Sequence, residues 1–133
     1  MLYFTKIWPK LINFYPKDNT PGCTTESIGF SQHHQKFLDN NTRVFGISRD
    51  SLVSHVKFCA KYDFPFELLS DANEQVCQLF DVIKIKNMYG KQVRGIERST
   101  FLFDSSGKLV KEWRGLKVPG HVTEVLEAAK ATK

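Results

Sequence analysis

The residue best suited to chemistry is Cys23, which ends the run Pro16-Lys17-Asp18-Asn19-Thr20-Pro21-Gly22-Cys23. The apolar stretch Leu11–Tyr15 precedes this run and predicts a buried strand, and the residues after Cys23 have the apolar spacing of a helix. Because Pro-Gly is a turn signal, the cysteine is expected at a helix N-terminus. Free backbone N–H groups and the helix dipole stabilise a thiolate there, and the thiolate is the nucleophilic form of cysteine.

Two residues of the same run suit a pocket around that thiol. Reduction of a hydroperoxide by a thiolate requires an aligned O–O bond and stabilisation of charge on the departing oxygen. Thr20 lies three residues before Cys23, so it can place a hydroxyl and a backbone N–H on the same turn. Pro16 fixes the backbone of the loop and can shield it from water. We therefore expect Thr20 and Pro16 to line the site of Cys23.

A cation for the thiolate must come from elsewhere in the chain. The best candidate is Arg98, because it directly precedes the expected strand Ser99–Phe103 and a strand end can present a guanidinium to a neighbouring loop. Other pairings are open at this point. Two further arginines could share the cationic role, Arg94 and Arg49, and two carboxylates could pair with Arg98 instead, Glu97 and Asp104.

Length and composition are those of one globular domain over residues 1–133, with 41% hydrophobic and 25% charged residues. No apolar run reaches the roughly 18 residues of a membrane span. The first residues lack the layout of a signal peptide, so a cytoplasmic location is expected. The net charge of +5 is spread along the chain, which makes nucleic acid an unlikely main partner.

Apolar periodicity and turn signals divide the chain into alternating strands and helices. The strands are expected over Leu11–Tyr15, Arg43–Ser48, Phe64–Leu69, Ser99–Asp104 and Lys108–Trp113. The helices are expected over Cys23–Leu38, after a cap at Asp50 or Ser51, around Val76, Leu79 and Phe80, and along Val122, Val125, Leu126 and Ala129. The order β-α-β-α-β-α-β-β-α implies an α/β fold, in which helices cover both faces of a central mixed sheet.

Three local features extend this outline. Pro65 confines its strand to a sheet edge or to the first residues of the strand. Leu52, Val56 and Cys59 form an apolar stripe with the spacing typical of a helix face that packs against a core. Lys84–Gly95 is polar and is expected to be the longest loop.

The spacing of cysteines and histidines does not favour a metal site. Cys23, Cys59 and Cys77 are separated by 36 and 18 residues without a CxxC pair, and the four histidines do not pair with them at zinc-like spacing. His33 and His34 are adjacent, so they point in different directions on a helix. We expect His34 to be half-buried and His33 to lie on the surface. Cys77 is expected to be a buried apolar filler.

The sequence resembles the peroxiredoxins. Pro16-x-x-x-Thr20-x-x-Cys23 has their active-site pattern, and the fuller run Tyr15–Thr24 looks like the PrxQ branch, also called bacterioferritin comigratory protein. The resemblance covers nearly the whole chain from about Leu11 and includes Phe45-Gly46-Ile47-Ser48, Leu68-Leu69-Ser70-Asp71, Asn87-Met88-Tyr89-Gly90-Lys91 and Gly95-Ile96-Glu97-Arg98-Ser99-Thr100-Phe101. It implies a thioredoxin-like fold.

The resemblance also implies a function and the residues that perform it. In the family, the cysteine matching Cys23 attacks a hydroperoxide and becomes a sulfenic acid, and the residues matching Pro16, Thr20 and Arg98 line the pocket. The expected substrates are hydrogen peroxide and small organic hydroperoxides. No metal or organic cofactor is implied, recycling by thioredoxin or a similar thiol reductant is expected, and so is a monomer.

The chain departs from the PrxQ pattern at its N-terminus. Members of that branch carry an extra β-hairpin before the strand that precedes the active-site run, whereas here only Met1–Lys10 stands before Leu11. We therefore expect the N-terminal hairpin to be missing.

The resemblance further suggests how the sulfenic acid is resolved. Many PrxQ members have a second cysteine five residues after the first, but Ile28 occupies that position. Another subgroup has it on the following helix, where Cys59 matches, so an intramolecular disulfide between Cys23 and Cys59 is expected. Cys59 could instead be an apolar filler, and the chain would then be a one-cysteine peroxidase that an external thiol reduces directly.

Two functions outside peroxide reduction remain open at this stage. A thiol–disulfide oxidoreductase would need two cysteines poised for exchange, and the missing CxxC disfavours it. A holdase or nucleic-acid-binding module would use the positive net charge and an exposed sheet edge.

Overall fold

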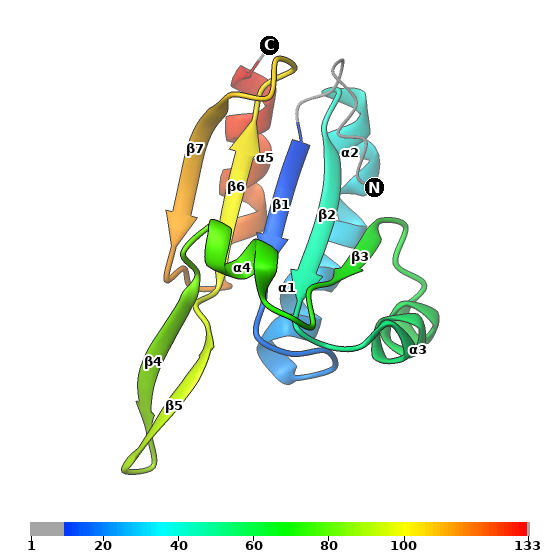
Figure 1. Cartoon of the computed structure of the whole chain (residues 1–133). Helices are drawn as coiled ribbons and strands as arrows, with labels where there is room; N and C mark the ends of the chain where they lie inside the picture. The colour runs from blue at the N-terminus through cyan, green and yellow to red at the C-terminus, as the bar shows by residue number, and fades with distance from the viewer. Residues whose placement is uncertain (1–9, 133) are drawn as a thin grey trace.

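A five-stranded mixed sheet runs through the centre of the molecule (Figure 1). The computed structural model describes residues 10–132. The strand order is β3-β2-β1-β6-β7, in which β1, β2 and β3 are parallel and β6 and β7 are antiparallel to their neighbours. The bounds are β1 Lys10–Phe14, β2 Arg43–Ser48, β3 Glu67–Ser70, β6 Ser99–Phe103 and β7 Leu109–Arg114.

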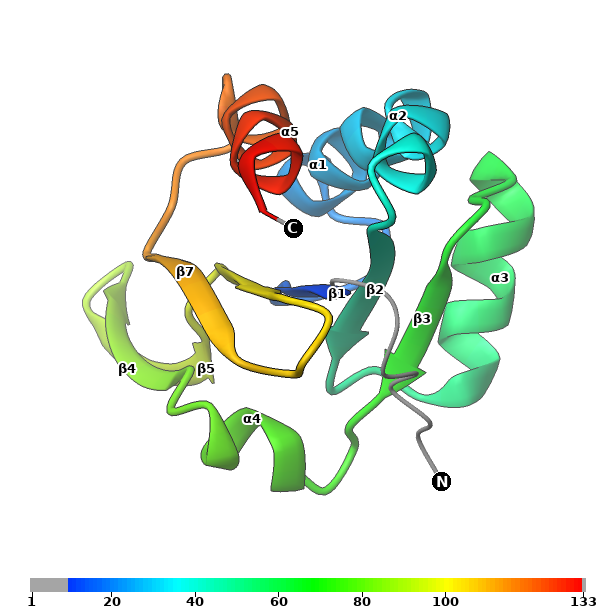
Figure 2. The same cartoon turned by 90° about the horizontal axis from the view of Figure 1, so that it is seen from above.

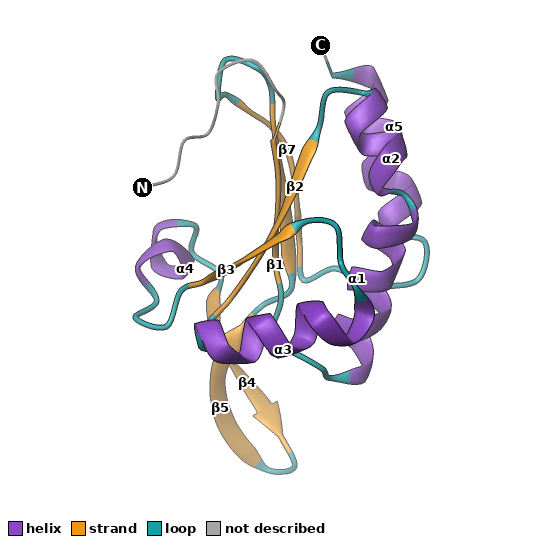
Figure 3. Cartoon of the chain, turned by 90° about the vertical axis from the view of Figure 1, so that its right-hand side faces the viewer, coloured by secondary structure: helices purple, strands orange, loops and turns teal. Residues whose placement is uncertain are grey.

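Helices cover both faces of this sheet. α1 (Pro21–Gln32), α2 (His34–Asp39) and α5 (His121–Ala131) lie on one face, and the short α4 (Gln75–Leu79) lies on the other (Figures 2 and 3). α3 (Leu52–Tyr62) runs beside the β3 edge on the outside of the molecule. The expected α/β fold with a mixed central sheet is thus confirmed.

The central strand β1 separates two apolar cores. Leu11 and Tyr15 point into the core under α1, α3 and α5, whereas Ile12 and Phe14 point into a second core under α4. All four side chains are at most 4% exposed. A strand buried on both faces shows a continuous apolar run rather than an alternating one, which is why this segment was recognisable from the sequence.

One expected helix has different boundaries in the structure. The helix expected over Cys23–Leu38 begins at Pro21 and is interrupted at His33, which ends α1 and precedes α2. The ring nitrogen Nδ1 of His33 lies 2.9 Å from the carbonyl oxygen of Gly29, and the side chain is half-buried rather than on the surface. His34 is half-buried, as expected.

The segment Lys84–Gly95 is a hairpin, so its interpretation as the longest loop was wrong. β4 (Ile83–Met88) and β5 (Lys91–Ile96) pair antiparallel and project from the body of the molecule (Figure 1). Tyr89 and Gly90 form the turn, and both have positive φ angles, as the turns of two-residue hairpins require. The lysines along both strands concealed the strand pattern because the hairpin is exposed on its faces and buries little apolar surface.

The apolar stripe of α3 faces solvent, so its assignment to the core was wrong. Leu52 and Val56 are 67% and 61% exposed, and Cys59 is half-buried. The buried residues of this helix are His55 and Phe58. The helix begins after Ser51, whose side chain accepts a hydrogen bond from the backbone N–H of Ser54.

The remaining elements agree with expectation in type. β2 has the predicted bounds, whereas β3 lies at a sheet edge but begins at Glu67, after Pro65, instead of at Phe64. In α4 the buried residue is Cys77, whereas Leu79 is 81% exposed. Within residues 10–132, no helix is long and apolar enough to cross a membrane. The expected loss of an N-terminal hairpin concerns residues 1–9, which lie outside the described residues.

Candidate active site

The first turn of α1 places Cys23 beside free backbone N–H groups. Pro21 occupies the first helical position, where its missing N–H costs nothing. Thr20 is the N-cap residue in extended conformation, but its side chain makes no capping hydrogen bond. The early N–H groups of a helix have no partner within the helix, so those of Gly22 and Cys23 are available to a ligand.

Cys23, Arg98 and Glu26 form a buried cluster of charged and polar groups. Nη2 of Arg98 donates a hydrogen bond to Sγ of Cys23 at 3.3 Å, and Nη1 donates to Oε1 of Glu26 at 2.8 Å. Cys23 is 1% exposed, and the side chains of Arg98 and Glu26 are 16% and 0% exposed. Burial opposes the charge of Arg98, but Glu26 and Cys23 outweigh it and raise the pKa of the guanidinium. The guanidinium is therefore held in place between the sulfur and the carboxylate.

Strand register brings Arg98 to this point. In the antiparallel pair of β1 and β6, Phe14 lies opposite Ser99, so the residue before β6 meets the loop that leaves β1. Gly22 makes the close approach possible, because a Cβ atom there would lie 3.1 Å from Nη2 of Arg98.

Glu26 connects this cluster to the polar interior. Burial raises its pKa, and Arg98 opposes that shift. Its Oε2 lies 3.9 Å from Nε2 of His121, whose pKa burial lowers to about 4, so this imidazole is neutral at neutral pH. His121 shares a 2.9 Å hydrogen bond with the hydroxyl of Thr100, which in turn donates to Oδ1 of Asn13. Arg98 is thus the charged partner of Glu26 among these neighbours.

Thr20 and Pro16 lie on the loop that leads into α1, and both are half-buried. The hydroxyl of Thr20 donates to the carbonyl oxygen of Lys17 at 2.9 Å. Because its proton is engaged in that bond, the oxygen presents lone pairs that can accept a hydrogen bond from a ligand. Asn19, just before it, has a φ of 61°, the left-handed region that asparagine tolerates better than most residues.

A buried ion pair ties this loop to α3. Nδ1 of His55 lies 2.7 Å from Oδ2 of Asp18, and Nε2 lies 3.1 Å from the carbonyl oxygen of Leu69. Both neighbours are acceptors, so both ring nitrogens carry protons and the imidazole is a cation. Tyr15 and Ser54 donate to the same carboxylate at 2.6 and 2.7 Å. Burial lowers the pKa of His55, but Asp18 outweighs it, and the net shift is upward.

Cys59 lies on α3, away from the first turn of α1. Its thiol donates to the carbonyl oxygen of Phe64 at 3.4 Å, and the side chain packs against the larger apolar core. The three cysteines are free of disulfides in this structure. A bond between Cys23 and Cys59 would therefore require both helices to unwind locally.

Several other candidates are not brought to the site. Arg94 and Arg49 both pair with Glu74, so neither supplies the cation for Cys23. Cys77 lies in the core under α4. Among residues 10–132 no group of histidine, cysteine and carboxylate side chains is arranged to hold a metal ion.

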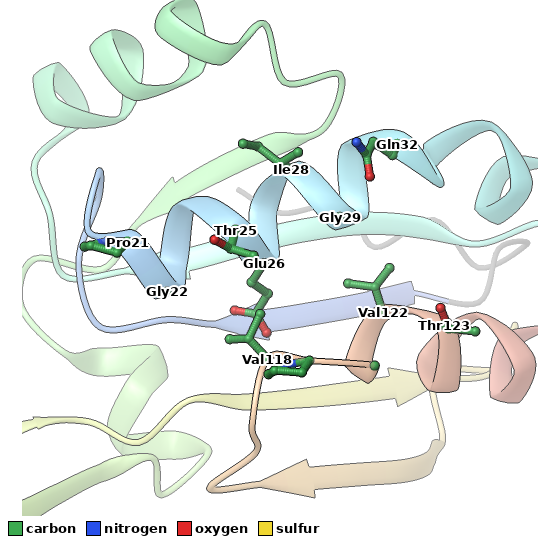
Figure 4. Close-up of a pocket in the computed structure, with 12 residues that line it drawn as sticks. Pro21, Gly22, Thr25, Glu26, Ile28, Gly29, Gln32, Val118, Val122 and Thr123 are labelled. Carbon is green, nitrogen blue, oxygen red and sulfur yellow. The ribbon is translucent and has the colours of Figure 1, made fainter.

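An apolar groove of about 650 Å³ opens between α1, along its whole length, and the start of α5 with the loop before it (Figure 4). One end is formed by Gly22 and Glu26, next to Arg98. Ile28, Val118 and other residues line the remainder. The groove offers space for an apolar group close to the charged cluster.

Sequence reasoning missed Glu26 and the pair of Asp18 and His55. Glu26 lies three residues after Cys23, so the two share a helix face, and this spacing is the signal that could have found it. For Asp18 and His55 the sequence offers no such signal, because 37 residues separate them.

Comparisons with known proteins agree with this geometry. The model of the AhpC/TSA family matches residues 6–112. A peroxiredoxin Bcp of Xanthomonas campestris is 55% identical over 121 residues, which cover 91% of this chain and 76% of the relative. A peroxiredoxin Bcp of Bacillus subtilis is 48% identical over 120 residues, which cover 90% and 76%. A solved structure of the bacterioferritin comigratory protein of Xanthomonas campestris superposes with a TM-score of 0.91 at 53% identity, covering 93% of this chain and 78% of that one.

These similarities confirm the resemblance and the thioredoxin-like fold. The family model alone covers most of the chain. The two relatives are 55% and 48% identical over 91% and 90% of the chain, which shows that the fold and the family are shared. The chain therefore belongs to the AhpC/TSA family and is a peroxidase of the PrxQ branch of peroxiredoxins.

Proposed function

We propose that Cys23 is the nucleophile that reduces hydroperoxides and that Arg98, Thr20 and Pro16 form its pocket. The observation that carries this proposal is the 3.3 Å contact between the guanidinium of Arg98 and the sulfur of Cys23. It joins a cation to a thiol at a helix N-terminus, and both features favour the thiolate. Pro16 limits the access of water to this pocket.

The step itself is a displacement on oxygen. The thiolate of Cys23 attacks the terminal oxygen of the hydroperoxide, an S–O bond forms and the O–O bond breaks. The remaining oxygen leaves as an alkoxide or hydroxide, takes up a proton and departs as an alcohol or water, while the sulfur becomes a sulfenic acid. Thr20 accepts the hydrogen bond of the peroxide O–H, and the N–H groups of Gly22 and Cys23 hold the oxygens. Arg98 stabilises the charge that moves from sulfur to the leaving oxygen.

The substrates we propose are hydrogen peroxide and small organic hydroperoxides. The pocket is polar at Cys23, which suits the O–O group itself. The groove that starts at Gly22 and Glu26 is apolar along Ile28 and Val118, and it can take an alkyl group. A solved structure of the Xanthomonas campestris relative concerns alkyl peroxide reduction by that protein.

We propose that Cys59 resolves the sulfenic acid. Its thiol attacks the sulfur of Cys23, a disulfide forms and water leaves. Two solved variants of Xanthomonas campestris peroxiredoxin Q carry serine in place of cysteine at positions 36 residues apart, the same separation as between Cys23 and Cys59. The half-buried position of Cys59 requires local opening first, and the ends of short helices open at low free-energy cost.

Reduction of that disulfide closes the cycle. A thiolate from a reductant must attack one of the two sulfurs, and thioredoxin or a protein of similar chemistry is the donor that we propose.

The test is the mass of the intact protein after treatment with an equimolar amount of hydrogen peroxide. The wild type should lose two hydrogens, and Cys59→Ser should instead gain one oxygen. Cys23→Ser should remain unmodified and should no longer consume peroxide. Peroxide consumption by Cys23→Ser at the rate of the wild type would refute the role of Cys23. A sulfenic product in both the wild type and Cys59→Ser would make the chain a one-cysteine peroxidase.

A further inference from the structure

The loop that leads into α1 is bonded to α3 on both sides of Cys59. Four residues before Cys59, Nδ1 of His55 lies 2.7 Å from Oδ2 of Asp18. Two residues after Cys59, Nζ of Lys61 donates to Oδ1 of Asn19 at 3.2 Å. The two loop residues are adjacent in the chain, so one short segment is fastened to two turns of the helix. Unwinding of α3 around Cys59 therefore has to break both attachments.

The two attachments differ in strength. The side chains of His55 and Asp18 are 2% and 3% exposed, and Nε2 of His55 is bonded in addition to the carbonyl oxygen of Leu69 at 3.1 Å. The bond between Lys61 and Asn19 is exposed. A charged hydrogen bond in the interior contributes more to stability than one in contact with water. The pair of Asp18 and His55 is therefore the main attachment between the loop and the helix.

The charge of His55 depends on the groups that face it. Two carboxylates do so, Asp18 from the loop and Asp50 from the segment after β2. Tyr15, just after β1, places its hydroxyl 3.5 Å from Nδ1, and burial and Asp18 raise the pKa of this hydroxyl, so it stays protonated. β3 contributes the carbonyl oxygen of Leu69. Burial opposes the charge of His55, but Asp18 outweighs it, and the net shift of the pKa is upward.

We propose that Asp18 and His55 form a latch that controls the resolving step. While the latch is closed, it keeps Cys59 on α3 and away from Cys23. Once it opens, the thiol of Cys59 attacks the sulfur of the Cys23 sulfenic acid. An S–S bond forms, the S–O bond breaks, and the hydroxyl leaves as water with the proton of the thiol. The latch residues act through Cys59, so they are positioning residues, and the inference rests on the resolving role proposed for that cysteine.

The latch also decides how long the sulfenic acid is open to further oxidation. A second hydroperoxide can oxidise the sulfur of Cys23 to a sulfinic acid, and that hydroperoxide is itself reduced to water or an alcohol. This reaction competes with the attack by Cys59. A latch that opens slowly therefore favours the sulfinic acid, and one that opens readily favours the disulfide.

The latch makes the resolving step dependent on pH. In the closed state the pKa of His55 is raised, and in the open state it returns to the ordinary histidine value of about 6.5. Between these two values opening releases a proton, so the equilibrium constant for opening rises by up to about tenfold per pH unit. Below about pH 6.5 the latch has its full strength. Above the closed-state pKa the imidazole is neutral, and the contribution of the charge is lost.

The experiment follows disulfide formation after peroxide has already reacted. The reduced protein is mixed with hydrogen peroxide, the reaction is stopped with acid at a series of times, and intact mass gives the amounts of sulfenic acid, sulfinic acid and disulfide. The conversion of sulfenic acid to disulfide has a rate constant that does not depend on peroxide concentration. The wild type, His55→Gln and the matched control His33→Gln are compared between about pH 6 and about pH 9.

The expected result is a ratio of rate constants that changes with pH. At about pH 6, His55→Gln should form the disulfide about tenfold faster than the wild type or more, because a buried charged hydrogen bond is missing. At about pH 9 the two rate constants should approach each other. The ionisation of Cys59 also varies with pH, but it is common to both proteins and cancels in the ratio. His33→Gln should follow the wild type at each pH.

The carboxylate provides a second arm. Asp18→Asn has the same shape and should also speed disulfide formation at about pH 6. The double variant Asp18→Asn/His55→Gln should be no faster than the faster single variant, because the pair is broken only once. With excess peroxide at the same pH, the wild type should accumulate more sulfinic acid than either single variant. Thermal melting identifies the variants that are folded at the assay temperature, and Asp18→Asn carries the test if His55→Gln is not.

Three results would count against the inference. A wild-type rate constant in the folded latch variants at about pH 6 would overturn it. A ratio that is the same at both ends of the pH range would also overturn it, since His55 would then hold the helix by packing and not by charge. If the wild type forms no disulfide at any pH, the resolving role of Cys59 fails, and the failure is assigned to the proposed function rather than to the latch.

Discussion

Cys23 and Cys77 occupy matching positions in different surroundings. Each is the third residue of its helix, each is free, and they are 1% and 0% exposed. At α4, the carboxylate of Asp71 accepts hydrogen bonds from the backbone N–H groups of Val76 and Cys77 at 3.1 and 2.7 Å. At α1, the side chain of Thr20 leaves the corresponding groups free.

The neighbouring charge also differs in sign. Burial and the carboxylate of Asp71 raise the pKa of Cys77, so its thiol stays protonated. The guanidinium of Arg98 contacts the sulfur of Cys23 instead. The two helix ends therefore differ in two respects: whether a carboxylate of the protein already binds the backbone N–H groups, and whether a cation faces the sulfur.

The largest effect is expected from removal of this cation. Arg98→Met keeps the aliphatic stem but loses both hydrogen bonds, and the rate constant for hydrogen peroxide should fall by about 100- to 1000-fold, as for other groups that stabilise transition-state charge. Arg98→Lys should recover part of the loss, since an ammonium is a point charge that cannot reach Glu26 and Cys23 as the guanidinium fork does. The rate is measured by stopped-flow fluorescence.

Arg94→Met is the control, because that arginine pairs with Glu74 outside the site. It should react as the wild type does. A wild-type rate in Arg98→Met would remove the cation from the explanation of why Cys23 and Cys77 differ.

A smaller effect is expected when the charge behind the cation is neutralised. Glu26→Gln keeps the shape of the side chain but removes the charge that holds Arg98, so the guanidinium should lose its fixed orientation. We expect the peroxide rate to fall by about tenfold, the cost of one misaligned charged hydrogen bond. The same stopped-flow measurement tests it, with melting temperature as the control for folding. A rate equal to that of the wild type would show that Arg98 needs no support from Glu26.

The loop of Cys23 can be loosened without touching the cysteine. The pKa of His55 is raised in the folded state, because Asp18 outweighs the opposing effect of burial. Its stabilising contribution is therefore fully present below the ordinary histidine pKa of about 6.5 and is lost as the pH rises through the folded-state pKa. His55→Gln should lower the free energy of unfolding by about 1–3 kcal/mol at low pH and by less at high pH.

Urea denaturation at about pH 6 and about pH 9 measures this difference. The wild type should lose more stability than His55→Gln over that interval. The opposite order would mean that His55 is neutral in the folded protein.

The smallest effect is expected at the second buried cysteine itself. Cys77→Ala should leave the peroxide rate unchanged, because the thiol stays protonated beside Asp71 and lies under α4. Alkylation of the native wild type by iodoacetamide should modify Cys23 first and leave Cys77 unmodified, as peptide mass mapping can show. Early alkylation of Cys77 would erase the contrast between the two helix ends.

Features that depend on a short stretch of sequence were predicted correctly, whereas features that depend on packing between distant segments were not. The central strand, β2 and the hairpin of β6 and β7 were predicted because buried strands and a Ser-Ser-Gly turn are legible in short windows. The β4–β5 hairpin was not, since its strands are rich in lysine and bury little. The α3 stripe was misassigned because periodicity reveals that a face is apolar but not what lies opposite it.

By itself, the sequence determined the local half of the site. Thr20, Pro21 and Cys23 lie within one turn, so turn and helix rules sufficed to place the thiol at a helix start. Only the tertiary structure decided that Arg98, 75 residues later, contacts the sulfur, and that Glu26 lies buried behind it. It also decided that Leu52 and Val56 of α3 face solvent. These outcomes depend on strand register and on which helix faces are already covered, and neither property is contained in any short stretch of the chain.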